Sequence, residues 1–241
     1  MSLQNTRGFF ITGTDTEVGK TLVAGLTMHK LKKTFDKVYG YKPVVAGISM
    51  VNGKAQNEDV VVLQRMGSTL LASENICPYQ LKKPIAPHIA AAEEKVFLNP
   101  DVMLDKYHRL KKIADFLVVE GVGGFIVPIN DDFDTAKFAS KISLPVILVV
   151  SIKLGCLNHA VLTAEAIRNR GLCLAGWIAN CIDQSPDSFA PSNIKTLKCI
   201  LDSPCLGVVP FSKDIKTPYD ENEIFRLAKY IDLPPISTSL E

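Results

Sequence analysis

Short apolar segments recur along the chain, without the alternation of apolar and polar residues expected of a strand with one wet face. They cover residues 8–12, 37–41, 116–119, 145–150, 174–178 and 206–209. Between them, apolar residues three or four positions apart indicate helices that start near Gly19, Asp59, Asp101, Thr135, Leu157, Asn193 and Glu221. Strands buried on both faces and alternating with helices predict a doubly wound, mainly parallel α/β sheet with helices on both faces.

The length of the chain fits one domain of this type, because 241 residues, 47% of them hydrophobic, can form a large core. Residues 47–54 and 182–191 are rich in Gly, Asn, Ser, Asp and Pro, and we expect them to be loops too short to separate domains. We therefore expect one α/β domain over residues 1–241. Leu233-Pro234-Pro235 should end the last helix and leave a flexible tail over about 233–241.

Composition argues against several kinds of function. The 27 Lys and Arg residues nearly balance the 25 Asp and Glu residues, so we expect solvated helix faces and no nucleic-acid partner. No apolar run approaches the roughly 20 residues that span a bilayer, and the N-terminus is polar, so we expect a cytoplasmic protein without a membrane partner. Six cysteines without a C-x-x-C pair predict free buried thiols, and the four histidines lack metal-site spacing.

The first apolar segment runs directly into a glycine-rich loop, Gly13-Thr14-Asp15-Thr16-Glu17-Val18-Gly19-Lys20-Thr21, which an apolar helix follows. Glycines let backbone N–H groups turn toward phosphate oxygens, and the helix N-terminus adds partial positive charge. Lys20 would reach the β- and γ-phosphates, and the Thr21 hydroxyl would bind Mg²⁺. Five residues separate Gly13 from Gly19-Lys20-Thr21, one more than in the common pattern. The strand–loop–helix context nevertheless predicts a phosphate loop (P-loop) of the nucleoside triphosphatase type.

A carboxylate at the end of a second buried strand is expected to help hold the metal ion. Glu120 follows the segment 116–119 and precedes Gly121-Val122-Gly123-Gly124, where the backbone can approach a ligand closely. By itself, an acidic residue at a strand end could equally be a solvated boundary. The glycines after Glu120 favour a role in the site.

Four segments together go beyond a generic nucleotide site. They are the phosphate loop, Gly40-Tyr41-Lys42-Pro43-Val44, Glu120-Gly121-Val122-Gly123-Gly124, and Lys153-Leu154-Gly155-Cys156-Leu157-Asn158-His159-Ala160. In this order they closely resemble the dethiobiotin synthetase family, and the resemblance extends from the first strand to about Pro210. It includes Gly176-Trp177-Ile178-Ala179-Asn180 and Gly207-Val208-Val209-Pro210.

The resemblance implies roles for individual residues. ATP would be bound by Gly13, Thr14, Asp15, Thr16, Glu17, Val18, Gly19, Lys20, Thr21, Asn180 and Pro210, the last two in the adenine pocket. Mg²⁺ would be held by Thr21, Asp59 and Glu120. Substrate would be bound by Glu17, Lys42, Gly123, Gly155, Cys156 and Asn158, and the catalytic residues would be Lys42, Lys20 and Thr16. The family also implies a homodimer, because Gly155, Cys156 and Asn158 would receive the substrate's carboxylate from the neighbouring subunit.

Several of these residues have ordinary structural alternatives. Lys42 could be a surface lysine, and Asp59 could cap the helix that begins there. Asn180 could be a turn residue and Asn158 a helix cap. For these four residues, the functional interpretation rests on the resemblance.

One position departs from the family pattern. After Lys42-Pro43-Val44 the family tends to have a hydroxyl residue before glycine, whereas this chain has Ala46 before Gly47. Alanine cannot donate a hydrogen bond, so a substrate contact there must be lost, made by backbone or water, or replaced by Ser49.

The resemblance implies a ligase that forms the cyclic urea of dethiobiotin from 7,8-diaminononanoate, carbon dioxide and ATP, through a carbamate and a mixed anhydride with phosphate. Replacing Lys20 or Lys42 by glutamine is predicted to leave folding intact and to lower diamine-dependent phosphate release strongly. An alternative is a partitioning or positioning ATPase with the same fold. Such proteins usually carry a second lysine five positions before Lys20, where this chain has Asp15.

Overall fold

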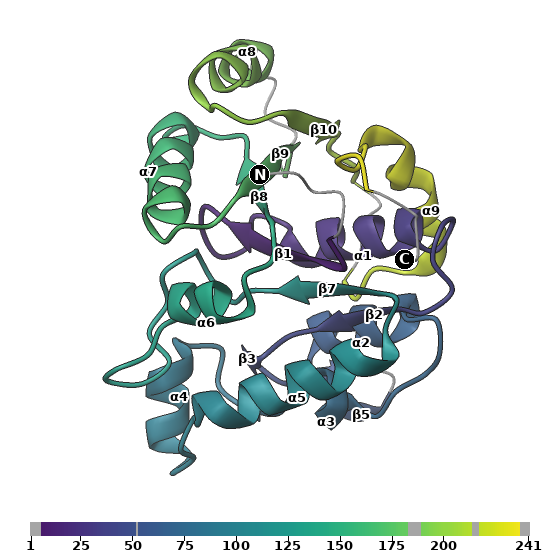
Figure 1. The fold of residues 1–241 in the computed structure, drawn as a ribbon, viewed down its shortest axis with the longest axis vertical. Helices are drawn as coiled ribbons and strands as arrows, with labels where there is room; N and C mark the ends of the chain where they lie inside the picture. Colours follow the sequence, from purple (N-terminus) through teal and green to yellow (C-terminus); the bar gives the residue numbers. More distant parts are fainter. Residues whose placement is uncertain (1–5, 52, 183–188, 214–216, 237–241) are drawn as a thin grey trace.

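Six parallel strands form the central sheet in the computed structural model of the protein, in the order β10-β9-β8-β1-β7-β2 (Figure 1). They are β1 (Gly8–Gly13), β2 (Val38–Tyr41), β7 (Phe116–Glu120), β8 (Val146–Ser151), β9 (Leu174–Asn180) and β10 (Cys205–Val209). The structure describes residues 6–51, 53–182, 189–213 and 217–236. The six strands predicted from the apolar segments and the doubly wound α/β fold are confirmed.

Seven helices begin within about three residues of the predicted positions. They are α1 (Lys20–Leu31), α2 (Glu58–Met66), α5 (Pro100–Ile113), α6 (Thr135–Ile142), α7 (Cys156–Asn169), α8 (Ala190–Ile200) and α9 (Glu221–Leu227). Four start at a side chain that accepts hydrogen bonds from the first turn, which satisfies backbone N–H groups that have no partner inside the helix. These caps are Asn57, Asn99, Asp134 and Asp220.

The sheet separates two apolar cores, because successive side chains of a strand point to opposite faces. In β1, Phe9 and Ile11 belong to the core covered by α1, α2 and α9, whereas Phe10 belongs to the core covered by α5, α6, α7 and α8. Both faces of the sheet are therefore dry, which explains why its strands are apolar throughout.

Several short elements between β2 and α5 were not predicted. β3 (Val44–Ala46) pairs in parallel with β6 (Tyr79–Leu81), and α3 (Ser73–Ile76) and α4 (Pro87–Glu93) lie nearby in the chain. The prediction of a loop over 47–54 is wrong in part. β4 (Ser49–Val51) and β5 (Lys54–Gln56) form an antiparallel hairpin there, because the backbone groups of the two short strands satisfy each other.

Two further loop predictions fall partly outside the described residues. Of the predicted loop 182–191, residues 183–188 are not described, and Ala190 already begins α8. The last helical turn is η1 (Ala228–Tyr230), upstream of the two prolines, and Leu233 and Ile236 pack against the core covered by α1, α2 and α9. The end of the predicted tail, 237–241, is not described.

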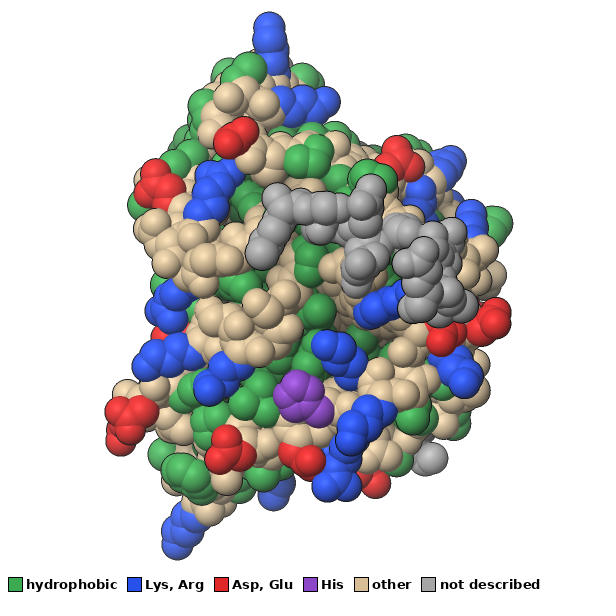
Figure 2. Space-filling model, viewed as in Figure 1, with side chains coloured by type: hydrophobic (Ala, Val, Ile, Leu, Met, Phe, Trp, Pro, Cys, Tyr) green, Lys and Arg blue, Asp and Glu red, His purple; other side chains and the backbone are tan. Residues whose placement is uncertain are grey.

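The surface and the cysteines add three observations. Figure 2 shows Lys and Arg side chains in separate groups over one face, without a continuous basic surface. Within the described part of the chain, no helix is long and apolar enough to cross a membrane. Of the six cysteines, only Cys77 and Cys156 are buried, so the prediction of buried thiols is correct for two of them.

The sheet topology fixes where a ligand site should be sought. The chain leaves β1 through α1 toward β2, and it leaves the adjacent strand β8 through α7 toward β9, in the opposite direction. In open α/β sheets, ligands bind beyond the carboxyl ends of the strands at such a switch point. The glycine-rich loop between β1 and α1 lies at this position.

Candidate active site

The phosphate loop is held between β1, β8 and β9. Thr14 N donates to Val149 O of β8 at 3.1 Å, and Asn180 Nδ2 at the end of β9 donates to Val18 O at 2.9 Å. Gly19 has φ 90°, and a Cβ atom there would lie 2.1 Å from Asn180 Nδ2. Only glycine fits this position without moving the asparagine.

The loop leaves the N-terminus of α1 ready for an anion. Gly19 is the N-cap residue of α1, and no side chain caps this helix within the described structure. Glu17 is held at φ 58°, a left-handed conformation that costs energy for a residue with a side chain and is often found at ligand sites. Backbone N–H groups at the start of a helix, together with the helix dipole, favour phosphate binding.

Lys20 is buried in this loop without a carboxylate partner. Its side chain is 7% exposed, and Nζ donates to the backbone oxygen of Asp15 at 2.9 Å. Burial, followed by the positive charge of Lys42, lowers the pKa of Lys20 to about 8. The ammonium group has therefore lost water without gaining an opposite charge in contact.

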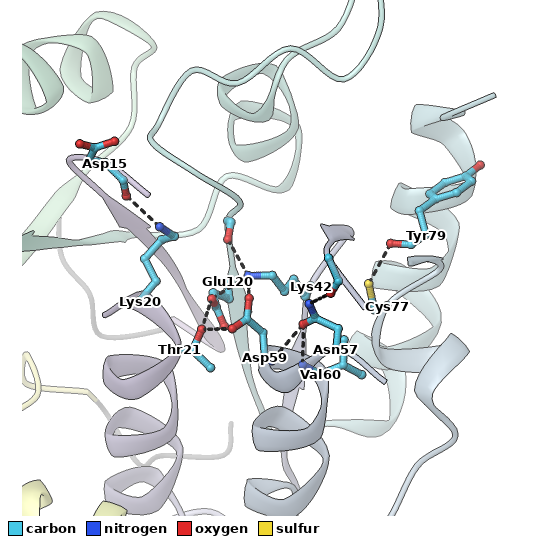
Figure 3. Close-up of polar contacts among 12 residues, drawn as sticks. Asp15, Lys20, Thr21, Lys42, Asn57, Asp59, Val60, Cys77, Tyr79 and Glu120 are labelled. Atoms are coloured by element: carbon cyan, nitrogen blue, oxygen red, sulfur yellow. Dashed lines mark hydrogen bonds and ion pairs between the residues drawn. The ribbon is translucent and has the colours of Figure 1, made fainter. Parts of the chain in front are cut away.

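The first residues of α1 and α2 and the end of β7 bring three oxygen ligands together (Figure 3). Thr21 Oγ1 lies 2.7 Å from Asp59 Oδ1 and 2.7 Å from Glu120 Oε1. Since one hydroxyl has a single proton to donate, it can satisfy only one of these carboxylates at a time. The three side chains predicted to hold Mg²⁺ are thus adjacent.

Lys42, which directly follows β2, contacts this cluster. Its Nζ is 2.7 Å from Glu120 Oε1 and 2.9 Å from Asp59 Oδ2, and it donates to Gly121 O at 3.1 Å. The Lys42 side chain is 2% exposed and that of Glu120 is fully buried. The alternatives of a surface lysine at 42 and a solvated strand end at 120 are therefore wrong.

The charges of this cluster depend on one another. Burial alone would lower the pKa of Lys42, but the charges of Asp59 and Glu120 outweigh it and hold that pKa above its ordinary value. Burial raises the pKa of Glu120, and Lys42 offsets part of that increase. Burial would also raise the pKa of Asp59, yet Lys42 and the Thr21 hydrogen bond lower it.

The donor atoms of the cluster fit Mg²⁺. Among the residues that the structure describes, the buried Glu120 Oε2 has no hydrogen-bond partner, although buried carboxylate oxygens normally have one. Mg²⁺ prefers hard oxygen ligands and is usually bound by one or two carboxylates together with substrate phosphates. A set of three or more His, Cys, Asp or Glu side chains around one point is not found in the described residues, and this metal does not require one.

A glycine-rich turn after Glu120 lies against the phosphate loop. A Cβ atom on Gly123, which has φ 60°, would lie 3.6 Å from Thr16 Oγ1, and one on Gly124 would lie 3.8 Å from Gly13 O. Thr16 and Glu17 are exposed on the loop. The predicted catalytic Thr16 and the predicted substrate residues Glu17 and Gly123 thus lie at one edge of the sheet.

The predicted adenine residues lie beside each other at the ends of β9 and β10. Asn180 pairs in register with Val209, which Pro210 follows. Asn180 is a buried strand residue, so the alternative of a turn residue is wrong.

The predicted tail-binding segment forms the beginning of α7. Gly155 is the N-cap residue at φ 90°, Cys156 is buried in the core covered by α5, α6, α7 and α8, and Asn158 is exposed in the first turn. Asn158 therefore does not cap the helix. Lys153, just upstream, forms a 3.8 Å ion pair with Asp15, so this segment lies next to the phosphate loop.

One residue of the cluster was missed in the sequence. Asn57, not Asp59, caps α2, and its side chain also bonds to the Gly47 backbone. This leaves Asp59 free to contact Lys42 and Thr21. An asparagine directly before Glu58 and Asp59 at a helix start is a cap signal that could have identified it.

The fold and the site together define the class: this is a P-loop nucleoside triphosphatase, in which a glycine-rich loop, a lysine and an acidic metal position meet at the carboxyl edge of a parallel sheet. A family model described as an AAA domain matches residues 7–219. The chain is also similar in fold to a ParA family ATPase from Chlorobium tepidum, with a TM-score of 0.54 and 13% identity over 88% of this chain and 86% of that one. The cell division ATPase MinD of Pyrococcus furiosus has a TM-score of 0.54 and 14% identity over 93% and 97%.

Curated relatives identify the family. The ATP-dependent dethiobiotin synthetase BioD of Aromatoleum aromaticum is 48% identical over 204 residues, covering 85% of this chain and 90% of that protein. The protein with the same name from Ralstonia nicotianae is 40% identical over 227 residues, covering 94% and 96%. The chain belongs to the ATP-dependent dethiobiotin synthetase family, and its likeness to the partitioning ATPases is one of fold alone.

Proposed function

We propose that the protein closes the cyclic urea of dethiobiotin from 7,8-diaminononanoate, carbon dioxide and ATP, as part of biotin biosynthesis. Membership of its family makes it an ATP-dependent ligase. The observation that carries the proposal in this chain is the convergence of Lys20 and Lys42 at one edge of the sheet, next to two carboxylates and a hydroxyl.

The reaction brings two anions together. One amine adds to carbon dioxide and loses a proton, which gives a carbamate. A carbamate oxygen then attacks the γ-phosphorus of ATP, and ADP leaves. The second amine attacks the carbonyl carbon of this mixed anhydride, the C–O bond to phosphate breaks, and the ring closes with release of phosphate and the proton of the attacking amine.

Protein groups act mainly by neutralising charge and fixing geometry. Lys20 and the N-terminus of α1 would bind the β- and γ-phosphates, and Lys42 would attract the carbamate. Holding the second amine next to the carbamate formed on the first makes ring closure an intramolecular step, and such orientation can contribute roughly 7–11 kcal/mol. We propose Lys20, Lys42 and Thr16 as the catalytic residues.

Thr21, Asp59 and Glu120 would hold Mg²⁺. When bound, the ion would supply positive charge that offsets the negative charge of the transferring phosphate. The unpartnered Oε2 of Glu120 supports this assignment.

The remaining assignments concern the two substrates and the assembly. Residues 13–21 with Asn180 and Pro210 would bind ATP, and Glu17, Lys42, Gly123, Gly155, Cys156 and Asn158 would bind the diamine. The exposed start of α7 supports a homodimer in which a neighbouring subunit completes the site, because Gly155 and Asn158 are both exposed there. We further propose a cytoplasmic protein with one catalytic domain.

A coupled assay for ADP tests the proposal. We expect ADP release to require both the diamine and bicarbonate, and dethiobiotin to form in equal amount. ATP hydrolysis that ignores the diamine but responds to DNA or lipid vesicles would instead support the partitioning-ATPase alternative.

A further inference from the structure

Asn57 makes more contacts than a helix cap needs. Its Oδ1 accepts hydrogen bonds from Asp59 N at 2.9 Å and Val60 N at 3.4 Å, which caps α2. Its Nδ2 donates to Gly47 O at 2.6 Å. Serine or aspartate could supply the cap alone, whereas the amide of asparagine accepts on one side and donates on the other.

The second bond closes the base of the β4–β5 hairpin. Gly47 precedes the hairpin and Asn57 follows it, and the Asn57 side chain is buried. Gly47 is also fixed from the other direction, because Gly47 N donates to Leu81 O at 2.9 Å and Ile48 N donates to Lys82 O at 3.0 Å. The Gly47 turn is thus held between β6 and the start of α2.

These contacts form a closed ring that includes two residues of the candidate site, Lys42 and Asp59. Asn57 holds the backbone of Asp59, whose side chain pairs with Lys42 at 2.9 Å. The chain runs from Lys42 through β3 to Gly47, and Gly47 returns to Asn57. Figure 3 shows Asn57 next to Asp59 and Lys42 within this cluster. One side chain therefore joins the carboxylate side of the site to the turn that follows the proposed substrate lysine.

We propose that Asn57 is a positioning residue that sets the distance between the Asp59 carboxylate and the Gly47 turn, and so shapes the diamine side of the site. This inference rests on the proposed function. Asn57 acts through Asp59 and Gly47 and does not itself need to touch the diamine. Loss of its bond to Gly47 should weaken diamine binding more than ATP binding, because the cap on Asp59 is kept and the phosphate loop is held separately by Val149 and Asn180.

The test separates the cap from the bond to Gly47. Asn57→Ser keeps a cap acceptor but is too short to reach Gly47 O, whereas Asn57→Ala removes both contacts. Asn99→Ser is a matched control, because Asn99 caps α5 through Asp101 N at 2.9 Å. For each variant, KM for diamine and for ATP, kcat, the Mg²⁺ requirement and the melting temperature are measured.

We expect Asn57→Ser to raise KM for the diamine roughly 3- to 10-fold, the effect of losing one hydrogen bond. Its KM for ATP, its Mg²⁺ requirement and its melting temperature should stay within the range of Asn99→Ser. An unchanged KM for the diamine would overturn the proposal. So would parallel changes in both KM values that follow the melting temperature, because those indicate a purely structural role.

A second measurement does not depend on turnover. Hydrogen exchange of the Gly47 and Ile48 amides should accelerate in Asn57→Ser relative to Asn99→Ser, because one side of the turn is released. Exchange rates equal to wild type would contradict the positioning role even if the protein had another substrate. A wild-type protein without diamine-dependent ADP release, but with faster exchange in the variant, would contradict only the proposed function.

Discussion

The phosphate loop around Lys20 and the cluster around Lys42 lie at the same edge of the sheet, yet they treat a buried lysine in opposite ways. Lys20 has a backbone oxygen as its partner, and its pKa falls to about 8. Lys42 is paired with two carboxylates, and its pKa lies above the ordinary value. Burial acts on both, so the difference comes from the neighbouring charges.

The phosphate loop and the Lys42 cluster therefore have different roles. In the described part of the chain Lys20 has no carboxylate within ion-pair distance, so an incoming triphosphate can supply an opposite charge in contact with it. Lys42 is already paired with two carboxylates, so its position is fixed before a ligand binds.

Replacing Lys42 should damage both stability and activity. In Lys42→Gln the buried Glu120 carboxylate loses its cation, and breaking a buried pair costs about 3–5 kcal/mol of unfolding free energy. Sequence reasoning alone predicts intact folding for this variant, and the burial of Glu120 changes that expectation. Urea unfolding gives the stability change, and the diamine-dependent ADP assay should show a loss on the order of 10³-fold.

A double variant serves as the control for Lys42. Lys42→Gln with Glu120→Gln removes both charges, so it should recover most of the unfolding free energy while activity stays lost. If Lys42→Gln alone were as stable as wild type, the two lysines would not differ as described.

Replacing Lys20 should affect activity without harming the fold. Lys20→Gln removes a poorly paired buried charge, so the unfolding free energy should change by no more than about 1 kcal/mol. Turnover should fall on the order of 10²-fold or more, because a group that stabilises transferring phosphate is lost. A Lys20 variant that unfolds as easily as Lys42→Gln would remove the contrast between the two regions.

Glu120 links the two regions through the proposed metal position. Glu120→Gln should raise the Mg²⁺ concentration needed for half-maximal activity by at least the roughly 10-fold that loss of an outer-sphere partner costs. A Mg²⁺ titration at saturating ATP measures this effect. The same titration with Asp105→Asn, a carboxylate that pairs with Arg109 on α5, should match wild type. An unchanged requirement in Glu120→Gln would argue against the metal assignment.

The pH dependence of nucleotide binding should show the low pKa of Lys20. Phosphates favour the protonated lysine, so the pKa rises in the complex and binding above about pH 8 takes up a proton. ADP affinity measured in EDTA should therefore fall as pH rises through about 8, approaching tenfold per pH unit above it. Lys20→Arg should lack this dependence, because its side chain stays charged. A wild-type affinity constant from pH 7 to 9 would contradict the low pKa.

Much of this arrangement could be predicted from the sequence. The six strands of the sheet are continuous apolar runs, and the phosphate loop is a local motif, so both leave a signal in consecutive residues. β3 pairs with β6, which lies far along the chain, so no local pattern shows that contact. The strands of the β4–β5 hairpin have three residues each, too few for a clear run or alternation of apolar residues, although the Asn-Gly pair between them is a hairpin signal that could have identified it.

In the site, too, local sequence patterns indicate single residues but not their contacts. Thr21, Lys42, Asp59 and Glu120 were predicted individually, but their contacts depend on how β2, β7 and two helix starts meet. Asn57 was missed because its second bond, to Gly47, spans a hairpin that the sequence did not predict. Burial of Lys42 and Glu120 likewise follows from tertiary packing and not from their neighbours in sequence.

The most direct test is a crystal structure with Mg²⁺, a non-hydrolysable ATP analogue and the diamine. In this complex, Lys20 Nζ should leave Asp15 O for the β- and γ-phosphates. Lys42 should remain at Glu120 and Asp59 and face the reacting amine. A triphosphate bound away from Gly19 and Lys20, or a Lys42 side chain turned away from the diamine, would contradict this prediction.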